Sequence, residues 1–143
     1  MGDYLIMNPL NFPILSTTIF LPVAGALLLL LMRNDKAVKG VAFATGIVNF
    51  VISIFIYAHF DPSTHLFQFG EFANWIPQYS INYVVGIDGI TIFLILLTTL
   101  LAPLCVLCSW TAIEQRVKEF MFCILIMESA MVGVFCALDF ILF

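Results

Sequence analysis

One acidic residue lies in the middle of a long apolar segment, where a carboxyl group could carry protons. Glu128 is near the centre of the apolar stretch at 120–138. A charge at the centre of a bilayer costs at least ~3 kcal/mol, so an acid at that depth is a functional-site hypothesis by default. Burial also favours the neutral, proton-carrying form of a carboxyl group. Glu128 is therefore a candidate proton-relay residue; the structural alternative is a protonated acid hydrogen-bonded to a neighbouring helix.

A second acid follows at a spacing that could extend the relay. Asp139 comes eleven positions after Glu128 (139 minus 128). If one helix continued through both, they would share a face and lie about 16 Å apart. That separation is too long for direct proton transfer and suits a relay with intervening water. Asp139 is the second relay candidate; the structural alternatives are a cap on a following helix or a residue at the membrane interface.

Other polar and helix-breaking residues in the apolar stretches are expected to be structural. Asp88 precedes the stretch at 89–109 and is a good N-cap, because its carboxylate can accept free backbone N–H groups. Pro103 is expected to kink that helix, since it leaves the carbonyl of Thr99 without its usual donor. Asn49 is expected to make a hydrogen bond to another helix.

Small residues recur at every fourth position near Glu128. Ser129, Gly133 and Ala137 would line one face of a helix. Small side chains at this spacing let membrane helices approach closely. Gly133 is therefore assigned to helix packing, in preference to ligand binding.

The cysteines and histidines do not indicate a metal or cofactor site. Cys105 and Cys108 form a C-x-x-C pair, but no second pair or nearby histidine completes a ligand set. Neither histidine has a second-ligand pattern, and the sequence has no Gly-rich phosphate loop, Ser-His-Asp set or iron–sulfur spacing. All four cysteines lie in apolar runs and are expected to be small buried hydrophobic residues: Cys105, Cys108, Cys123 and Cys136.

The composition predicts an integral membrane protein. Of 143 residues, 63% are hydrophobic and 10% are charged, and the mean hydropathy is +1.13. Soluble domains are nearer half apolar, and about a quarter of their residues are charged. The net charge of −4 and the lack of a basic stripe exclude nucleic-acid binding. The expected surroundings are a lipid bilayer.

The apolar residues fall into segments long enough to cross that bilayer, which needs about 20 residues each. The sequence predicts a single all-α membrane domain with four transmembrane helices. The stretch at 140–143 predicts the start of a fifth helix, so we expect the chain to be part of a longer protein. The four helices are expected at 14–32, 40–60, 89–109 and 120–138.

A long connection at 61–86 separates the second and third helices. It is rich in aromatic residues, which favour the membrane–water interface, and Pro62 and Pro77 break any helix there. The stretch at 79–85 alternates well enough to predict a short strand. The connection is expected to lie against the outer surface of the helices.

The basic residues predict an orientation, because they favour cytoplasmic loops. Neither the N-terminus nor the long connection contains one, so both are expected on the periplasmic side, or in the intermembrane space of an organelle. The two short connections are expected on the cytoplasmic or matrix side. They hold all five basic residues: Arg33, Lys36, Lys39, Arg116 and Lys118.

Several segments resemble a known family. The segments 83–90 (YVVGIDGI) and 97–104 (LTTLLAPL), with Ser109-Trp110, resemble the antiporter-like membrane subunits of respiratory complex I. Within that group, the chain is most similar to the subunit M family, called chain 4 in mitochondria. The segments that point to it are 116–120 (RVKEF), 133–139 (GVFCALD) and 18–25 (TIFLPVAG). The resemblance covers 18–143, and 83–139 is its specific part.

The resemblance implies the N-terminal part of a roughly 14-helix antiporter-like fold built from two inverted five-helix units. It implies a membrane-arm subunit that couples NADH oxidation and quinone reduction to proton translocation. Other membrane-arm subunits, including neighbouring antiporter-like ones, are the implied partners. NADH, FMN, Fe–S clusters and quinone are expected in other subunits and none in this chain. The family's principal proton-carrying residues lie on the fifth and later helices, so none is assigned to a position here.

Two rival functions remain open from the sequence. The chain could be a subunit of a multisubunit cation/proton antiporter, a group that shares the Gly-Asp-Gly type of opening of the third helix. It could also be a non-catalytic membrane scaffold. Neighbouring genes for redox subunits would favour the complex I hypothesis, and neighbouring genes for small antiporter subunits would favour the antiporter hypothesis.

Overall fold

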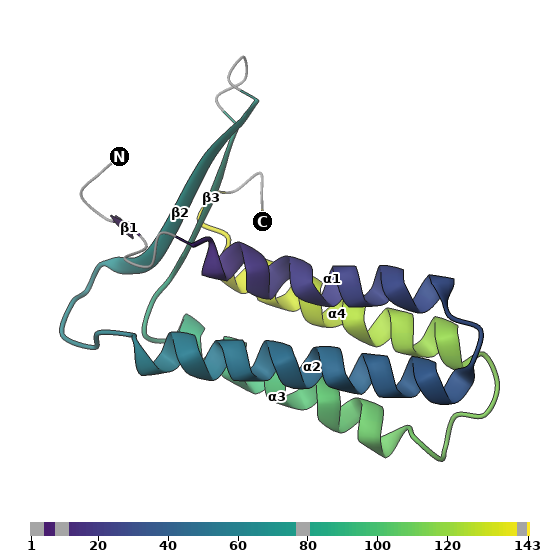
Figure 1. Ribbon diagram of the computed structural model, residues 1–143. Coiled ribbons are helices and arrows are strands. Elements are labelled where there is room, and N and C mark those ends of the chain that lie inside the picture. The colour runs from purple at the N-terminus through teal and green to yellow at the C-terminus, as the bar shows by residue number, and fades with distance from the viewer. Residues whose placement is uncertain (1–4, 8–11, 77–80, 140–142) are drawn as a thin grey trace.

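The computed structural model describes residues 5–7, 12–76, 81–139 and 143, and its main feature is a bundle of four long helices (Figure 1). The predicted helical membrane class is confirmed: the structure is mostly helical, and all four helices are long and apolar enough to span a membrane. In chain order they are α1 (Ile14–Leu31), α2 (Asp35–Ala58), α3 (Thr91–Cys108) and α4 (Val117–Cys136).

Helix α2 begins five residues before the expected position 40, because its polar first turn is capped. The side chain of Asn34 accepts the backbone N–H of Lys36 at 3.1 Å. Such a cap satisfies one of the donors that a helix start leaves free. The helix therefore includes a charged first turn, which the prediction from the length of the apolar stretch left out.

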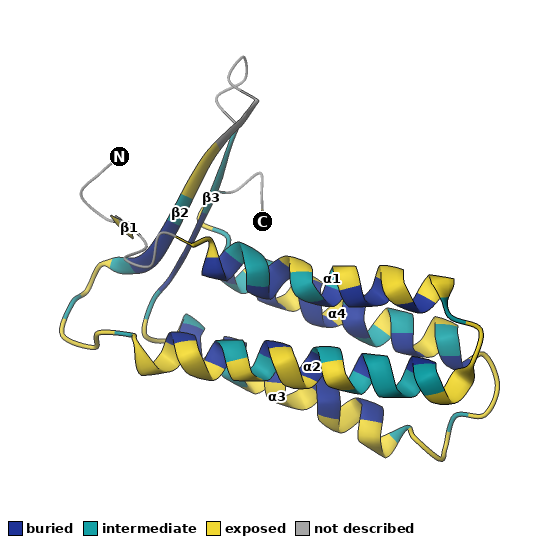
Figure 2. Ribbon diagram, viewed as in Figure 1, coloured by how far each residue is buried: buried dark blue, intermediate teal, exposed yellow. Residues whose placement is uncertain are grey.

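The outside of the bundle is apolar, as a lipid-facing surface requires. Large hydrophobic side chains are exposed along all four helices, and Figure 2 marks exposed positions in yellow on each of them. The expectation that the cysteines are buried is wrong for three of them. Cys105, Cys108 and Cys123 are exposed, and only Cys136 is buried. An apolar run inside a membrane can face either lipid or protein, so hydropathy alone does not distinguish the two.

Small residues set the closest helix contacts. A Cβ atom added at Gly25 of α1 would lie 2.6 Å from Cγ2 of Thr45 on α2. A Cβ added at Gly46 of α2 would lie 3.2 Å from Cδ of Pro103 on α3. Pro103 is therefore packed directly against a neighbouring helix, at a point where only a glycine fits easily.

The small-residue face of α4 lies against α1. The hydroxyl of Ser129 donates to the carbonyl of Ile19 at 2.6 Å. A Cβ at Gly133 would meet Cγ2 of the same isoleucine at 3.7 Å, an ordinary contact. The two helices run side by side in the bundle (Figure 1).

A three-stranded sheet lies at one end of the bundle. Strand β1 (Leu5–Met7) pairs in parallel with β2 (Phe67–Ile76), which pairs antiparallel with β3 (Ile81–Ile87). The strands of the long connection are thus more extensive than the predicted strand at 79–85. Residues 77–80 and 140–142 lie outside the described residues, and with them part of that strand and the predicted start of a fifth helix.

Only the base of the sheet is attached to the helices; β2 and β3 extend away from the bundle (Figure 1). The base includes Phe69, which is 2% exposed and belongs to the same apolar core as Ile14 and Ile92. The expectation that the connection lies along the helix surfaces therefore holds at its base and not along the length of the strands.

The opposite end of the bundle carries the two short connections, 32–34 and 109–116. Two lysines bind backbone carbonyls there. Nζ of Lys39 donates to the carbonyls of Trp110 (2.6 Å) and Ile113 (3.0 Å), and Nζ of Lys118 donates to that of Leu30 (3.3 Å). A cation is favourable beside the negative carbonyl end of a helix.

Candidate proton-carrying site

Glu128 lies inside the helix bundle with no exposed surface. Its partner is on another helix: Nδ2 of Asn49, on α2, donates to Oε1 of Glu128 at 2.8 Å. The interhelical hydrogen bond expected of Asn49 is confirmed. The residue is itself fully buried, so α2 and α4 are joined by a polar contact that water does not reach.

The second polar atom of each side chain has no hydrogen-bond partner in the part of the chain that the structure describes. These atoms are Oε2 of Glu128 and Oδ1 of Asn49. A buried polar atom without a partner is uncommon in folded proteins and calls for an explanation. Each side chain of the pair therefore keeps one buried polar atom that could form a further hydrogen bond.

Hydroxyl groups continue this polar region toward α3. The side chains of Ser53 and Thr99 are 2.7 Å apart, and either oxygen can be the donor. Thr99 also donates to the carbonyl of Ile95 at 2.9 Å. Ser53 is four positions after Asn49, one turn further along the same face of α2. The polar groups of three helices thus gather in the bundle interior.

A groove between α3 and α4 reaches Glu128 from the side. Its volume is about 200 Å³, and Thr98 is the other polar residue in an otherwise apolar lining. The groove therefore brings a largely apolar opening up to Glu128 on the α3 side of α4.

Asp139 does not lie on the same helix as Glu128, so the shared-face expectation is wrong. Helix α4 ends at Cys136, and the next residues pair with the sheet: Ala137 forms a bridge with Val85, and the N–H of Leu138 donates to the carbonyl of Val84 at 3.0 Å. Strand pairing takes the chain out of the helical path before Asp139. Its participation in a relay stays a prediction that no contact here tests.

Asp88 stands at the start of α3 in the geometry of a capping residue. Its Oδ1 accepts the N–H of Thr91 at 2.7 Å and that of Ile90 at 3.1 Å. The backbone N–H of Thr91 holds the pKa of the Asp88 carboxyl below its ordinary value of 3.8. The contacts fit the structural role expected from the sequence.

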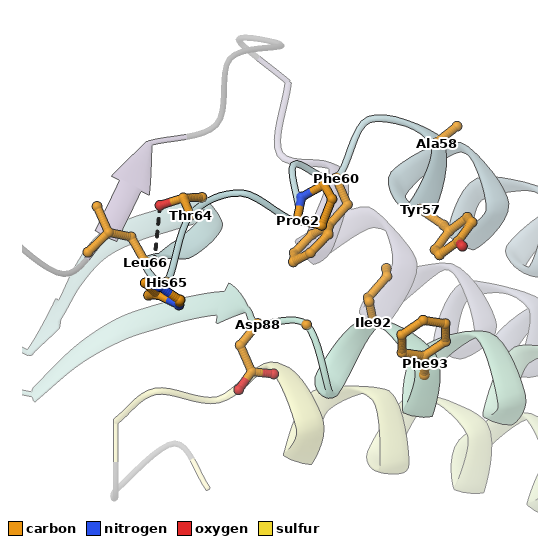
Figure 3. Close-up of a pocket in the computed structure, with 11 residues that line it drawn as sticks. Tyr57, Ala58, Phe60, Pro62, Thr64, His65, Leu66, Asp88, Ile92 and Phe93 are labelled. Atoms are coloured by element: carbon orange, nitrogen blue, oxygen red, sulfur yellow. Dashed lines mark hydrogen bonds between the residues drawn. The ribbon is translucent and has the colours of Figure 1, made fainter.

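Asp88 also borders a cavity of about 610 Å³ at this end of the bundle (Figure 3). The cavity lies between the end of α2 and the start of α3, and its walls are largely aromatic and apolar. His65 also lines the cavity, with the aromatic side chains of Tyr57, Phe60 and Phe93. Glu128 is not part of it. In the described residues no group of three His, Cys, Asp or Glu side chains could hold a metal ion.

A further acid, missed by sequence reasoning, joins the sheet to α1. Oε1 of Glu71, on β2, accepts the N–H of Leu15 at 2.8 Å, and Oε2 accepts the N–H of Ser16 at 3.0 Å. The Ser16 hydroxyl donates to the same carboxylate and is 2.9 Å from the hydroxyl of Tyr83. Burial raises the pKa of Tyr83 above its ordinary value. The only sequence signal was indirect: Pro13, at the start of α1, cannot cap it with a side chain.

The comparison with known families identifies the amino-terminal region of one respiratory subunit. Residues 16–134 match the family model described as NADH-ubiquinone oxidoreductase chain 4, amino terminus. The matched range contains all of the polar residues described above on α2, α3 and α4, including Asn49 and Glu128.

Individual relatives agree with that match. The chain is 37% identical to NADH-ubiquinone oxidoreductase chain 4 of Marchantia polymorpha over 131 residues, which is 90% of this chain and 26% of the relative. It is 37% identical over 142 residues to NADH-quinone oxidoreductase subunit M of Rickettsia typhi, covering 94% of this chain and 29% of the relative. It is 40% identical over 136 residues to NADH-quinone oxidoreductase subunit M of Rhodobacter capsulatus, covering 91% of this chain and 26% of the relative. The chain thus spans little more than a quarter of the length of these relatives.

Proposed function

Because this chain belongs to the family of NADH-ubiquinone oxidoreductase chain 4, at its amino terminus, we propose that it acts in the membrane arm of a proton-translocating NADH–quinone oxidoreductase. The chain corresponds to the amino-terminal part of an antiporter-like subunit there. The observation that carries the proposal is the match over 16–134 together with four membrane-spanning helices. In this role the chain is enzymatic only as a subunit of the complex.

Electron transfer is proposed to take place elsewhere in the complex. NADH, FMN, Fe–S clusters and quinone are assigned to other subunits, and this chain is assigned to the coupled movement of protons. The sequence supports this division, since its one C-x-x-C pair, Cys105 and Cys108, lies within a membrane helix and faces outward. The proposed direct partners are neighbouring antiporter-like subunits of the membrane arm.

The N-terminus and the β2–β3 hairpin are proposed to face the periplasm or the intermembrane space. Two features support this orientation. All five basic residues belong to the two short connections or the helix turns beside them, and both connections lie at the same end of the bundle, opposite the sheet (Figure 1). Basic residues favour the cytoplasmic or matrix side.

Purification of the complex tests the proposed function. An affinity tag on this chain should recover an assembly that oxidises NADH, reduces a quinone analogue and acidifies the outer side of resealed vesicles. Recovery of an assembly that exchanges cations for protons and does not oxidise NADH would favour an antiporter instead. Recovery of the NADH-oxidising complex at full pumping efficiency from cells that lack the chain would contradict a role in translocation.

Within this function, Glu128 is proposed to take part in the proton relay, with Asp139 as the weaker candidate. Support for Glu128 comes from its full burial, its contact with Asn49 and the groove beside it. Glu128→Gln keeps the shape and the hydrogen-bonding capacity of the side chain, but Gln does not exchange a proton near neutral pH.

The proposed role of Glu128 predicts a moderate fall in protons moved per electron in the E128Q complex, with normal assembly. A purely structural Glu should tolerate the change, with a loss below about 1.5 kcal/mol, the scale of one net hydrogen bond. Proton uptake per electron in membrane vesicles decides between the two. An unchanged ratio at normal turnover would return Glu128 to a structural role.

A further inference from the structure

The side chains of Asn49 and Glu128 are matched in a way that points to the location of a proton. Each ends in a planar group with two polar atoms. One atom of each is used in the 2.8 Å bond from Nδ2 of Asn49 to Oε1 of Glu128. The other two, Oδ1 and Oε2, are buried and have no partner in the described chain.

Both unpartnered atoms are acceptors if the carboxyl is ionised, and two acceptors cannot satisfy each other. An ionised carboxylate accepts only, and the amide oxygen also accepts only. A single proton on Glu128 changes this balance, because the carboxylic acid then offers one O–H donor and the amide oxygen needs one. With that proton in place, Oε2 of Glu128 becomes a donor that Oδ1 of Asn49 can accept.

The charges around the pair also favour the protonated acid. Helices α1 and α3 contain no charged residue, and the charges of α2 are confined to Asp35, Lys36 and Lys39, in its first turns. The only other charged residues of α4 are Lys118 and Glu119, about nine positions before Glu128 (128 minus 119). A buried carboxylate without a nearby cation is strongly unfavourable and takes up a proton instead.

We propose that Asn49 and Glu128 form a neutral amide–carboxylic acid pair, in which the amide oxygen of Asn49 accepts a hydrogen bond from the protonated carboxyl group of Glu128. Asn49 is then the positioning residue for that proton: it holds the acid from both sides and fixes the direction in which the O–H points. This inference deepens the proposed role of Glu128 and rests on it for its consequence in transport, but the pair itself can be tested without measuring transport.

Infrared spectroscopy of the intact purified complex tests the pair, because a protonated carboxylic acid has a carbonyl stretching band that a carboxylate lacks. The difference spectrum between the unmodified and E128Q complexes should contain this band. Asn49→Leu, which is similar in size, should move the band to higher frequency, since the carbonyl loses its N–H donor. Ser53→Ala is the matched control: Ser53 lies one turn away on α2, is buried and bonds to Thr99. It should leave the band in place.

Two results would overturn the inference. Carboxylate bands in place of the acid band in the E128Q difference spectrum would show an ionised Glu128 held by water or a cation. An acid band that does not move in N49L would show that Asn49 does not hold the proton. If N49L fails to assemble, the exchanged pair N49D/E128Q retains one acid and one amide. It should restore an acid band, and an assembled exchanged complex without the band would contradict the pair.

The same experiments separate failure of the pair from failure of the proposed relay. An acid band that responds to N49L, together with normal pumping in E128Q, would leave the pair intact and remove the relay. Reduced pumping in E128Q without any acid band would leave the relay role and remove the neutral pair.

Discussion

Three carboxyl groups show how the surroundings of a single residue decide its use. Asp88 and Glu71 both lie at the end of the bundle and accept backbone N–H groups at helix starts, Asp88 from its own helix and Glu71 from α1. Both gain from the positive end of a helix dipole. Among the described residues, Glu128 has no helix start and no cation beside it, and its partner is the amide of Asn49. The same functional group therefore serves as a cap in the first two positions, and in the third it is the proposed proton carrier.

The cap at Asp88 gives a pH-dependent contribution to stability. Its folded pKa is lowered below 3.8, so the contribution is fully present above that pH and is lost as the pH falls through the folded pKa. Asp88→Ala should cost about 1 kcal/mol at neutral pH. Asp88→Asn retains a hydrogen-bond acceptor without the charge, so it should remove only the loss of stability that acid causes. Thermal unfolding of the chain in detergent at neutral pH and near pH 3 checks both; equal acid sensitivity in D88N and the unmodified chain would contradict this account.

The cap supplied by Glu71 is predicted to hold the sheet on the bundle. Glu71→Gln loses the charge that two backbone N–H groups and the Ser16 hydroxyl contact, and hydrogen bonds to a charged group are worth about 1.5–3 kcal/mol. We expect faster hydrogen exchange in the first turn of α1 and lower thermal stability. Glu114→Gln, at an exposed acid in the α3–α4 connection, is the control and should change neither. Unaltered exchange in E71Q would show that the contact contributes little.

At the scale of elements, close contacts between helices and one irregular strand decide how the helices and the sheet pack together. Helix pairs meet at Gly25, where a Cβ would collide with Thr45, and at Gly46, where a Cβ would be in tight contact with Pro103. In β2, Phe69 adopts a positive φ of 54°, and the pairing register with β3 shifts between Gln68 and Glu71. Such bulges re-aim side chains. Here the irregularity lies beside both the core residue Phe69 and the capping residue Glu71.

The contact at Gly25 predicts a position-specific cost of a methyl group. Thr45 is stiff, and its hydroxyl donates to the carbonyl of Val41, so it cannot move aside easily. Gly25→Ala should therefore separate α1 from α2 and cost about 1–3 kcal/mol. Gly40→Ala on α2 is the matched control, because a Cβ there meets nothing within 4 Å. Denaturant titration in detergent measures both, and equal stability of the two variants would refute the close contact.

At the scale of the whole molecule, the basic residues and the sheet occupy opposite ends of the bundle. Lys39 and Lys118 bind backbone carbonyls at the end away from the sheet, so they stabilise the short connections as well as favouring one membrane side. The sheet, the start of α1 and the end of α4 form the other end. Because the two ends of the bundle differ in this way, the proposed orientation can be tested from either side of the membrane.

Cysteine labelling tests that orientation. A cysteine at Ser63, exposed near the sheet, should react with a membrane-impermeant reagent added from the periplasmic or intermembrane-space side. A cysteine at Asn34, exposed in the α1–α2 connection, should react only from the cytoplasmic or matrix side. The unmodified chain is the control, since its own cysteines lie within the membrane helices. The reverse labelling pattern would invert the orientation.

The sequence by itself determined the membrane class, the four helices, the family and the isolation of Glu128 in an apolar span. Each of these follows from local properties: apolar length, residue type, or short segments such as 83–90. The interhelical bond of Asn49 was also foreseen, because a lone amide in an apolar span needs a partner. Its bond to Glu128 was not, since hydropathy does not say which of several helices will face it.

Only the tertiary structure decided the contacts between distant parts of the chain. Asn49 meets Glu128 across 79 positions and Glu71 caps α1 across 56, separations at which helical periodicity carries no information. Helix α4 ends at Cys136, where the chain pairs with β3. Counting helical turns from Glu128 therefore could not locate Asp139. The outward-facing cysteines show the same limit. In a bilayer both the inside and the outside of a bundle are apolar, so the arrangement of the helices, and not the hydropathy of a residue, decides which way it faces.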